Sequence, residues 1–181
     1  MIEVVLPVPR RDDAVRPLAR RPATLRGGRL GLLDGWGDRR PDGSFTMYPL
    51  MAAVDRVAAA RWAVAEVVWR KKDRAGSPAS AAQLAVMAGC TAVVTGICLS
   101  GGCTAGAVGD AAELERRGVP TVTLCQDNFV RLAVAYATAL GYPDLPLLVY
   151  PAPVGGNLAE GATALVEDRA EVLVSALTGG G

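Results

Sequence analysis

The feature that most constrains the fold of this chain is an uncharged run that breaks into a glycine-rich turn. Residues 91–104 read TAVVTGICLSGGCT, and residues 91–97 are all β-branched or small. Such a run is typical of a strand buried on both faces of a parallel sheet. Gly101 and Gly102 permit a tight turn, and an amphipathic helical pattern follows. A strand, a turn and a helix in this order predict an α/β fold.

Four further strand-and-helix pairs accompany this one. The predicted strands cover residues 29–35, 65–72, 91–97, 120–127 and 145–151, and the predicted helices cover residues 48–63, 79–88, 104–117, 128–140 and 159–177. Strands that alternate with helices pair in parallel through right-handed crossovers. The pattern predicts a single doubly wound, flavodoxin-like sheet of about five strands in the order 2-1-3-4-5, forming one α/β domain over residues 29–178.

In this strand order the topological switch point lies between the first and third strands. Open α/β sheets bind ligands at such a point, outside the carboxyl ends of the strands. The loops expected to meet there are residues 34–37 and 98–104, with residues 125–128 beside them. We therefore expect a small-molecule site in these loops.

Residues 1–28 are rich in arginine and proline and lack sustained periodicity, so we expect an extended basic arm that is solvated or binds a partner. The net charge is only +1, and no nucleic-acid interface is expected. No apolar run approaches the roughly 20 residues of a membrane span, and the first residues lack the order of a signal peptide. A cytoplasmic protein without membrane contact, with reduced thiols, is the expectation.

The chain contains no histidine, which excludes Ser-His-Asp and Cys-His catalysis. Proton transfer would then depend on carboxylates, thiols, lysines, tyrosines or water. The spacing of Cys98 and Cys103 is not that of a zinc ribbon. We expect no metal and no cofactor.

Cys103 is the leading catalytic candidate, predicted just before the third helix. The positive end of a helix dipole favours a thiolate there, although Cys103 could instead be a small residue in a tight turn. We expect its sulfur to reach an accessible crevice. Ser100 would orient substrate or cap the helix, and the amides of Gly101, Gly102 and Thr104 would hold an anion.

Other candidates end neighbouring strands. Asp34 could be an acid or base, or a turn former before Gly35. Cys98 could be a second thiol or a core residue. Lys71 could receive an anionic group or belong to a solvated charge cluster.

The loop after the fourth strand supplies Cys125, Asp127 and Asn128 as candidate substrate-binding residues. The alternative is that Asp127 or Asn128 caps the fourth helix. Asp110, two turns into the third helix, could point back toward the site.

Two segments of the chain resemble the UGSC family. They are residues 91–129 and residues 139–156, and the likeness extends back to RLGLLDG and RKKDRAGSPAS, covering most of residues 25–160. That family is named for a selenocysteine-Gly-Ser-Cys motif. It contains selenoproteins and their cysteine homologues, and it is distantly similar to a selenoprotein component of the glycine reductase system.

The resemblance implies that Cys103 is the final cysteine of the motif and Gly101 its glycine. Gly102 stands where serine is usual, and Ser100 occupies the selenocysteine position. A selenolate or thiolate paired with a second thiol would support redox or sulfur chemistry, which a hydroxyl does not. Three alternatives follow from the serine at this position. Cys103 acts without a second thiol, Cys98 replaces the missing chalcogen from a nearby position, or this member of the family no longer performs redox chemistry.

The function we expect is that of a small enzyme in which Cys103 acts on an electrophilic, anionic small molecule. The reaction class would be lyase, hydratase, isomerase or sulfur transfer. The alternatives are a non-catalytic or regulatory subunit of a larger complex, and an acid/base enzyme that relies on Asp34 or Asp127. A homo-oligomer or a partner subunit is expected from the alanine- and valine-rich helices.

Overall fold

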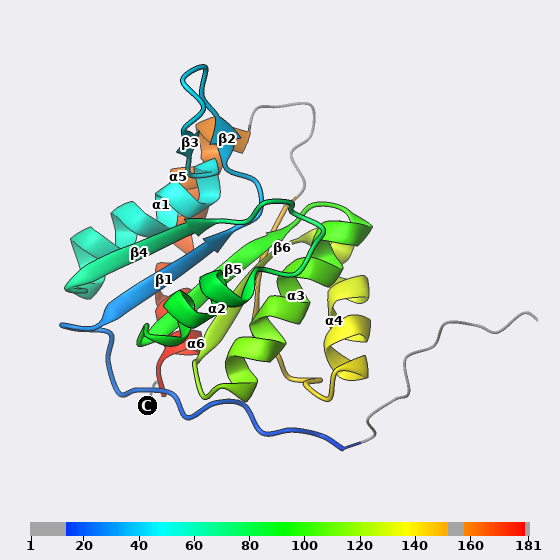
Figure 1. The fold of residues 1–181 in the computed structure, drawn as a ribbon. Coiled ribbons are helices and arrows are strands. Elements are labelled where there is room, and N and C mark those ends of the chain that lie inside the picture. Colours follow the sequence, from blue (N-terminus) through cyan, green and yellow to red (C-terminus); the bar gives the residue numbers. More distant parts are fainter. Residues whose placement is uncertain (1–13, 152–157, 180–181) are drawn as a thin grey trace, which may run out of the picture.

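A five-stranded parallel sheet forms the centre of the fold, and its strand order is β4-β1-β5-β6-β7 (Figure 1). The strands are β1 (Arg29–Asp34), β4 (Glu66–Lys71), β5 (Ala92–Cys98), β6 (Thr121–Gln126) and β7 (Leu147–Tyr150). This is the order 2-1-3-4-5, so the predicted topology is confirmed and is compatible with a flavodoxin-like arrangement. The computed structural model describes residues 14–151 and 158–179.

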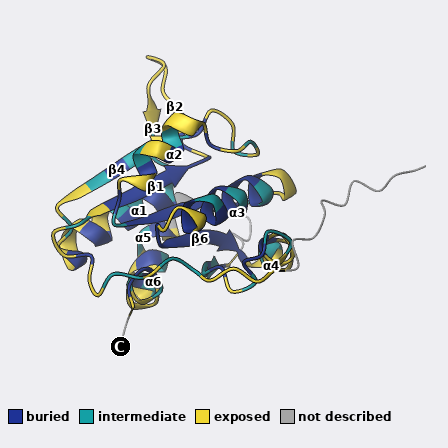
Figure 2. Ribbon diagram, turned by 60° about the horizontal axis from the view of Figure 1, so that its bottom comes forward, coloured by how far each residue is buried: buried dark blue, intermediate teal, exposed yellow. Residues whose placement is uncertain are grey.

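Helices cover both faces of the sheet. One face carries α1 (Pro49–Val57), α5 (Leu158–Asp168) and α6 (Ala170–Leu177), and the other carries α2 (Ala81–Ala88), α3 (Gly101–Arg116) and α4 (Val130–Ala139). Alternation along β1 places Leu32 against the first set and Leu33 against the second. All seven residues of β5 are buried, as the uncharged run predicted. In Figure 2, β1 and β6 are also largely buried, whereas the edge strand β4 is partly exposed.

Two helices begin at residues other than those predicted, because serine side chains set their starts. Helix α2, predicted from residue 79, begins at Ala81, because Ser80 caps it and forms a reciprocal capping box with Gln83. Helix α3 begins at Gly101 because the Ser100 side chain accepts a hydrogen bond from the Cys103 amide. The prediction that Cys103 precedes the helix is therefore wrong, since it is the third helical residue.

Three of the predicted helices consist of two helical segments each. Helix α1 continues as the π-helix η1 (Ala58–Trp62), and the short helix η2 (Asp127–Phe129) precedes α4. The predicted final helix is two helices that meet at Arg169, whose guanidinium donates to the Val149 carbonyl at 2.7 Å.

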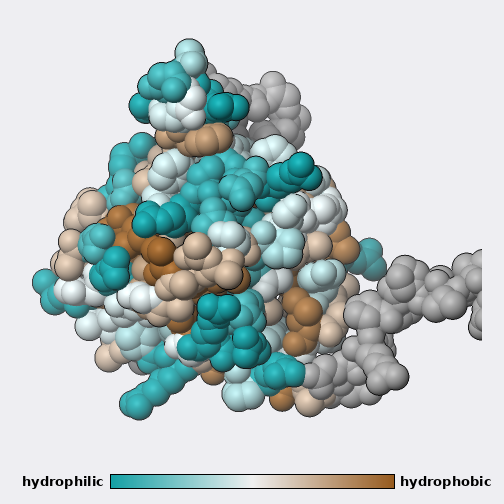
Figure 3. Space-filling model, viewed as in Figure 1, coloured by the Kyte–Doolittle hydropathy of each residue, from teal (hydrophilic) through white to brown (hydrophobic). Residues whose placement is uncertain are grey.

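The predicted turn between the first strand and first helix contains a hairpin of β2 (Asp38–Arg39) and β3 (Phe45–Thr46). It projects from the domain beside the carboxyl ends of β1 and β4 (Figure 1). Its exposed surface is largely hydrophilic (Figure 3).

The described part of the N-terminal arm, residues 14–28, runs along the amino edge of the sheet (Figure 1). The Arg16 amide donates to the Gly141 carbonyl at 2.7 Å, and the Leu25 side chain is buried in the core. Arg21 pairs with Glu115 at the end of α3. This part of the arm contacts its own domain, and residues 1–13 lie outside the described residues.

Within the described ranges, the helices are too short or too polar to cross a bilayer. The longest of them, α3, has 16 residues. It carries the buried carboxylates of Asp110 and Glu115.

Candidate functional site

The loop after β1 lies against the end of β5, at the switch point of the sheet. The Gly35 amide donates to the Gly96 carbonyl at 2.9 Å, and Trp36 Nε1 donates to the Ile97 carbonyl at 3.2 Å. The loop after β4 closes over the same place, since a Cβ on Gly35 would lie 3.1 Å from the Ala75 Cα. Glycine at position 35 is what lets the three loops approach.

Ser100 and Cys103 form a contact at the first turn of α3. The Ser100 hydroxyl lies against the Cys103 sulfur, and it also accepts from the Cys103 amide at 3.4 Å. Ser100, Gly101 and Gly102 are exposed, whereas Cys103 is only 3% exposed. The sulfur that we expected in an accessible crevice is buried under an exposed serine, because position three of the helix turns inward.

The remaining polar groups of this turn are partly engaged. Thr104 Oγ1 donates to the Ser100 carbonyl at 2.7 Å, and its side chain also hydrogen-bonds Cys98. A Cβ on Gly76 would lie 3.4 Å from the Gly102 carbonyl carbon, so the loop after β4 borders the start of α3. The predicted anion-binding amides of Gly101 and Gly102 lie on the exposed side of this turn.

Cys98 and Cys125 lie side by side at the ends of β5 and β6. A register shift between Gly96 and Cys98 brings Cys98 opposite Cys125, and both side chains are fully buried. The hydrogen bond between the two thiols, together with burial, raises the pKa of Cys98. The same bond lowers the pKa of Cys125. Cys98 and Cys125 therefore form a buried pair of thiols beneath the start of α3.

Asp34 is fully buried at the end of β1. Its carboxylate accepts from the amides of Trp36 at 2.7 Å and Tyr48 at 2.8 Å, and from Trp69 Nε1 at 3.3 Å. Burial raises the pKa of Asp34, and these hydrogen bonds partly oppose the rise. The carboxylate ties the loop after β1 to the start of α1, which extends the turn-forming interpretation.

Lys71 and Lys72 point to different places. The Lys71 ammonium donates to the Lys72 carbonyl and lies 5.3 Å from the centre of the Phe45 ring in the hairpin. Lys72 is buried and pairs with Asp110, which also accepts from the Ala79 amide at 2.8 Å. Asp110 therefore fastens the loop after β4 to α3 rather than reaching the switch point.

Asp127 and Asn128 are exposed on η2, after the end of β6. Asp127 Oδ1 accepts from the Asn128 amide at 2.7 Å. The N-cap residue of α4 is Phe129, without a side-chain cap. The alternative that either polar residue caps α4 is therefore wrong, because a 3-10 turn intervenes.

Tyr150 is a polar residue at this edge that the sequence reasoning missed. It ends β7, opposite Gln126, and it is 3% exposed. Its hydroxyl has no hydrogen-bond partner within residues 14–151 and 158–179. Burial, Tyr48 and the three neighbouring thiols raise its pKa. A tyrosine near the end of the predicted strand over residues 145–151 was the only signal, and a core tyrosine gives the same one.

Across the described residues there is no group of three or more cysteine, aspartate or glutamate side chains arranged to hold a metal ion.

A model of the UGSC family matches residues 3–179. The chain belongs to the UGSC family. No curated protein and no solved structure matches the chain. The UGSC match includes every candidate residue above.

Proposed function

We propose that this UGSC protein is a cysteine-dependent enzyme that acts on an electrophilic, anionic small molecule at the carboxyl edge of its sheet. Cys103 is the reactive residue and Ser100 its immediate partner. The contact between the Ser100 hydroxyl and the Cys103 sulfur is the observation that carries this proposal. The reaction would belong to the lyase, hydratase, isomerase or sulfur-transfer class.

The motif interpretation supports the pairing. In the selenoproteins that this chain resembles, the selenocysteine position corresponds to Ser100 and the final cysteine to Cys103. These two positions are the N-cap and the third residue of one helix, whose side chains meet. A chalcogen at the first position would therefore touch the second thiol, and a serine there leaves a hydroxyl that holds or relays a proton.

The exposed start of α3 favours an anionic substrate. The amides of Gly101 and Gly102 lie at the positive end of the helix dipole, where negative charge is stabilised. Developing negative charge on a substrate carbonyl would be stabilised at the same amides. The substrate would approach over Ser100, since that side chain is exposed and the sulfur beneath it is not.

Two chemical roles suit Cys103. As a nucleophile, its sulfur forms a bond to an electrophilic carbon, and the leaving group departs with the bonding electrons. As an acid or base, it moves a proton to or from a carbon beside a carbonyl group. Neither step is assigned to Asp34, which is fully buried and whose oxygens accept three hydrogen bonds.

A second candidate, a non-catalytic subunit of a larger complex, is favoured by one observation. Cys103 is 3% exposed, and reactive cysteines are at least partly accessible. In that case the motif would be a packed turn, and the exposed apolar side chains of Leu132, Val134 and Tyr136 on α4 would meet the partner.

Competitive alkylation tests the proposal. Iodoacetate and iodoacetamide have the same shape but only the first is anionic, and peptide mass spectrometry gives the rate at each cysteine. Cys90, 8% exposed at the opposite edge, is the internal reference. We expect the iodoacetate-to-iodoacetamide ratio at Cys103 to exceed that at Cys90 by about tenfold, the equivalent of about 1.4 kcal/mol of attraction.

Two variants complete this test. Cys103→Ser removes the labelled site, and Ser100→Ala removes the hydroxyl while leaving the thiol. In the Ser100→Ala variant, the rate at which Cys103 is alkylated should differ from the rate in the wild type. Equal ratios at Cys103 and Cys90, or no labelling of Cys103 while Cys90 is consumed, would contradict an enzyme of this kind. A stable heteromer recovered from the native host would then favour the subunit.

A further inference from the structure

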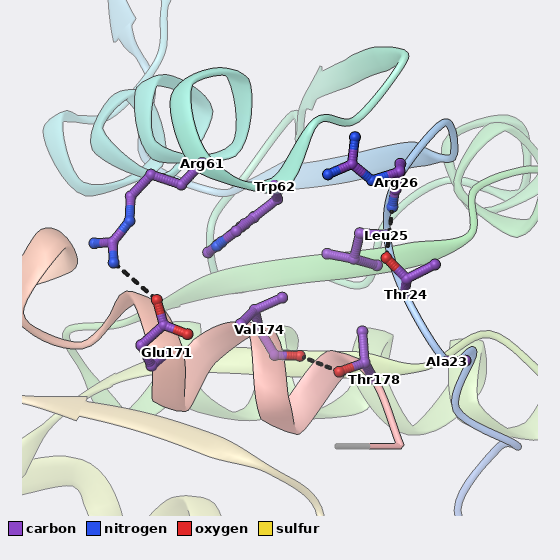
Figure 4. A pocket seen from close by; sticks show the side chains of 9 residues that line it. All are labelled: Ala23, Thr24, Leu25, Arg26, Arg61, Trp62, Glu171, Val174 and Thr178. Atoms are coloured by element: carbon purple, nitrogen blue, oxygen red, sulfur yellow. Dashed lines mark hydrogen bonds and ion pairs between the residues drawn. The ribbon is translucent and has the colours of Figure 1, made fainter. Parts of the chain in front are cut away.

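The two edges of the sheet differ in how their polar groups are arranged. At the amino edge, a cavity of about 270 Å³ lies between the N-terminal segment, η1 and α6 (Figure 4). In that view the Trp62 ring points toward the pair of Arg61 and Glu171 and away from the N-terminal segment, so the polar groups of the cavity do not converge. At the carboxyl edge, in contrast, the thiols of Cys98 and Cys125 meet.

A bulge in β5 brings these two cysteines together. Gly96 pairs with Leu124 on β6, and the next pair is Cys98 with Cys125, so Ile97 is passed over. Regular alternation would set Ile97 opposite Cys125. Ile97 instead packs in the core against α1 and α5, and Cys98 takes its place beside Cys125, against α3 and α4. Bulges re-aim side chains in this way and are frequent beside active sites.

The pair has the geometry that a disulfide needs. Neighbouring strands lie about 4.8 Å apart, and a disulfide joins Cα atoms that are roughly 4.4–6.8 Å apart. Cys98 and Cys125 are register partners on one face of the sheet, and the hydrogen bond between their thiols brings the sulfurs into contact. Both are free thiols. A bond between them therefore requires only small movements of the side chains.

We propose that Cys98 and Cys125 form a redox-active dithiol that a small hydroperoxide converts to a disulfide. One sulfur attacks a peroxide oxygen, the O–O bond breaks, and the leaving oxygen takes the thiol proton and departs as an alcohol, or as water from hydrogen peroxide. The second sulfur attacks the sulfenic acid so formed, the S–O bond breaks, and water leaves with the second thiol proton. Neither thiol has a step in the function proposed above, so this site is independent of it.

The oxidant reaches the pair through the start of α3. Both thiols are fully buried, and Thr104, in the first turn of that helix, hydrogen-bonds Cys98. The same turn contains Gly101 and Gly102, which are exposed, and glycine weakens a helix. Weakly held segments open locally without global unfolding. Because hydrogen peroxide is little larger than water, opening of this turn is enough to admit it.

Peptide mapping of the oxidised wild type tests the proposal. The folded protein is treated with hydrogen peroxide, its remaining thiols are alkylated, and it is then digested. Trypsin places Cys125 in the peptide of residues 118–131, apart from the other cysteines in residues 75–116, and cleavage after Leu99 separates Cys98 from Cys103. We expect the Cys98 and Cys125 peptides to be joined, with the loss of two hydrogen atoms, and dithiothreitol to separate them.

Matched variants make the test specific. Cys90→Ser/Cys103→Ser keeps only the pair, and it should lose both thiols together on oxidation and recover both with dithiothreitol. Adding Cys98→Ser leaves Cys125 alone, and the reversible loss should disappear. The peptide map of the wild type is independent of how these variants fold. Persistence of both thiols in the wild type while Cys90 is oxidised, a disulfide that forms only in urea, or linkage of Cys125 to Cys103 would each overturn the proposal.

Discussion

Glu115 and Tyr150 are both buried polar residues, but their hydrogen-bonding environments are opposite. The Glu115 carboxylate accepts five hydrogen bonds, from the Ala19 amide, from two nitrogens of Arg21, and from the amide and hydroxyl of Thr121. The Tyr150 hydroxyl has no partner among the described residues. The first lies at the amino edge of the sheet and the second at the carboxyl edge.

The Glu115 cluster contributes to the stability of the fold, whereas the Tyr150 hydroxyl does not. A satisfied buried network holds a fold together, and the Glu115 cluster joins the N-terminal segment to α3 and β6. An unsatisfied buried hydroxyl lowers stability but leaves a donor for another molecule. Cys98, Cys103, Cys125 and Tyr150 lie at the edge where open α/β sheets bind ligands.

Glu115→Ala tests how much the hydrogen-bonded cluster at the amino edge contributes to stability. The substitution leaves the Arg21 guanidinium buried without its carboxylate, so we expect the free energy of unfolding to fall by about 5 kcal/mol. Urea denaturation of the full chain measures the change. Glu113→Ala is the matched control, because that carboxylate pairs with exposed arginines, and it should lower stability by about 1 kcal/mol or less. Equal effects of the two substitutions would contradict a special role for the Glu115 cluster.

Asp110→Asn tests the buried pair that fastens the loop after β4. Lys72 and Asp110 are each 2% exposed, and the amide keeps an acceptor for Ala79 while leaving the ammonium unpaired. We expect a loss of about 3 kcal/mol in urea denaturation and faster iodoacetamide labelling of Cys103, since that loop borders the start of α3. An unchanged labelling rate despite lowered stability would show that the loop does not protect the thiol.

Tyr150→Phe should stabilise the protein, whereas the two substitutions above destabilise it. Removing a buried hydroxyl that has no partner among the described residues should raise the free energy of unfolding by about 1 kcal/mol. If Tyr150 donates to the substrate, the alkylation preference at Cys103 should fall in the same variant. Tyr136→Phe, on the exposed side of α4, should change neither quantity. If Tyr150→Phe instead destabilises the protein, the Tyr150 hydroxyl contributes to stability, as the Glu115 carboxylate does.

The smallest expected effect is on the pH dependence of stability. Burial raises the pKa of Asp34 above 3.8, so the folded protein holds this proton more tightly than the unfolded chain does. Stability from this group is present below pH 3.8 and is lost as the pH rises through the folded pKa. Asp34→Asn should therefore make the urea midpoint less dependent on pH above 3.8.

Asp42→Asn is the control for that measurement. Hydrogen bonds from Ser44 lower the pKa of Asp42, so its contribution is present above pH 3.8 and is lost as the pH falls. Its removal should flatten the curve on the acid side instead. If both variants change the slope in the same direction, the protonation of Asp34 is not governed by burial.

Strand order was predictable because it depends on patterns that are local in the sequence. Uncharged β-branched runs alternate with helical segments, and right-handed crossovers leave few ways to connect them. The contact of the loop after β1 with the end of β5 followed from that order. The starts of the helices were less predictable, because the start of α2 depends on the reciprocal hydrogen bonds between Ser80 and Gln83.

The surroundings of the candidate site depended on contacts between distant residues. No local pattern distinguishes Lys72, which pairs with Asp110, from Lys71, which lies against the hairpin. The register shift in β5 that sets Cys98 opposite Cys125 is likewise invisible in the chain, because it depends on how β6 pairs with its neighbour.

The sequence by itself determined the α/β topology, the edge at which the motif lies and the exclusion of histidine catalysis, because periodicity and composition are properties of the chain. Only the tertiary structure decided that Cys103 turns inward beneath Ser100, that the Asp34 carboxylate accepts three hydrogen bonds and that the Tyr150 hydroxyl has no partner among the described residues. Burial and hydrogen-bond partners depend on side chains far apart in sequence, so they become defined only when the sheet and its loops assemble.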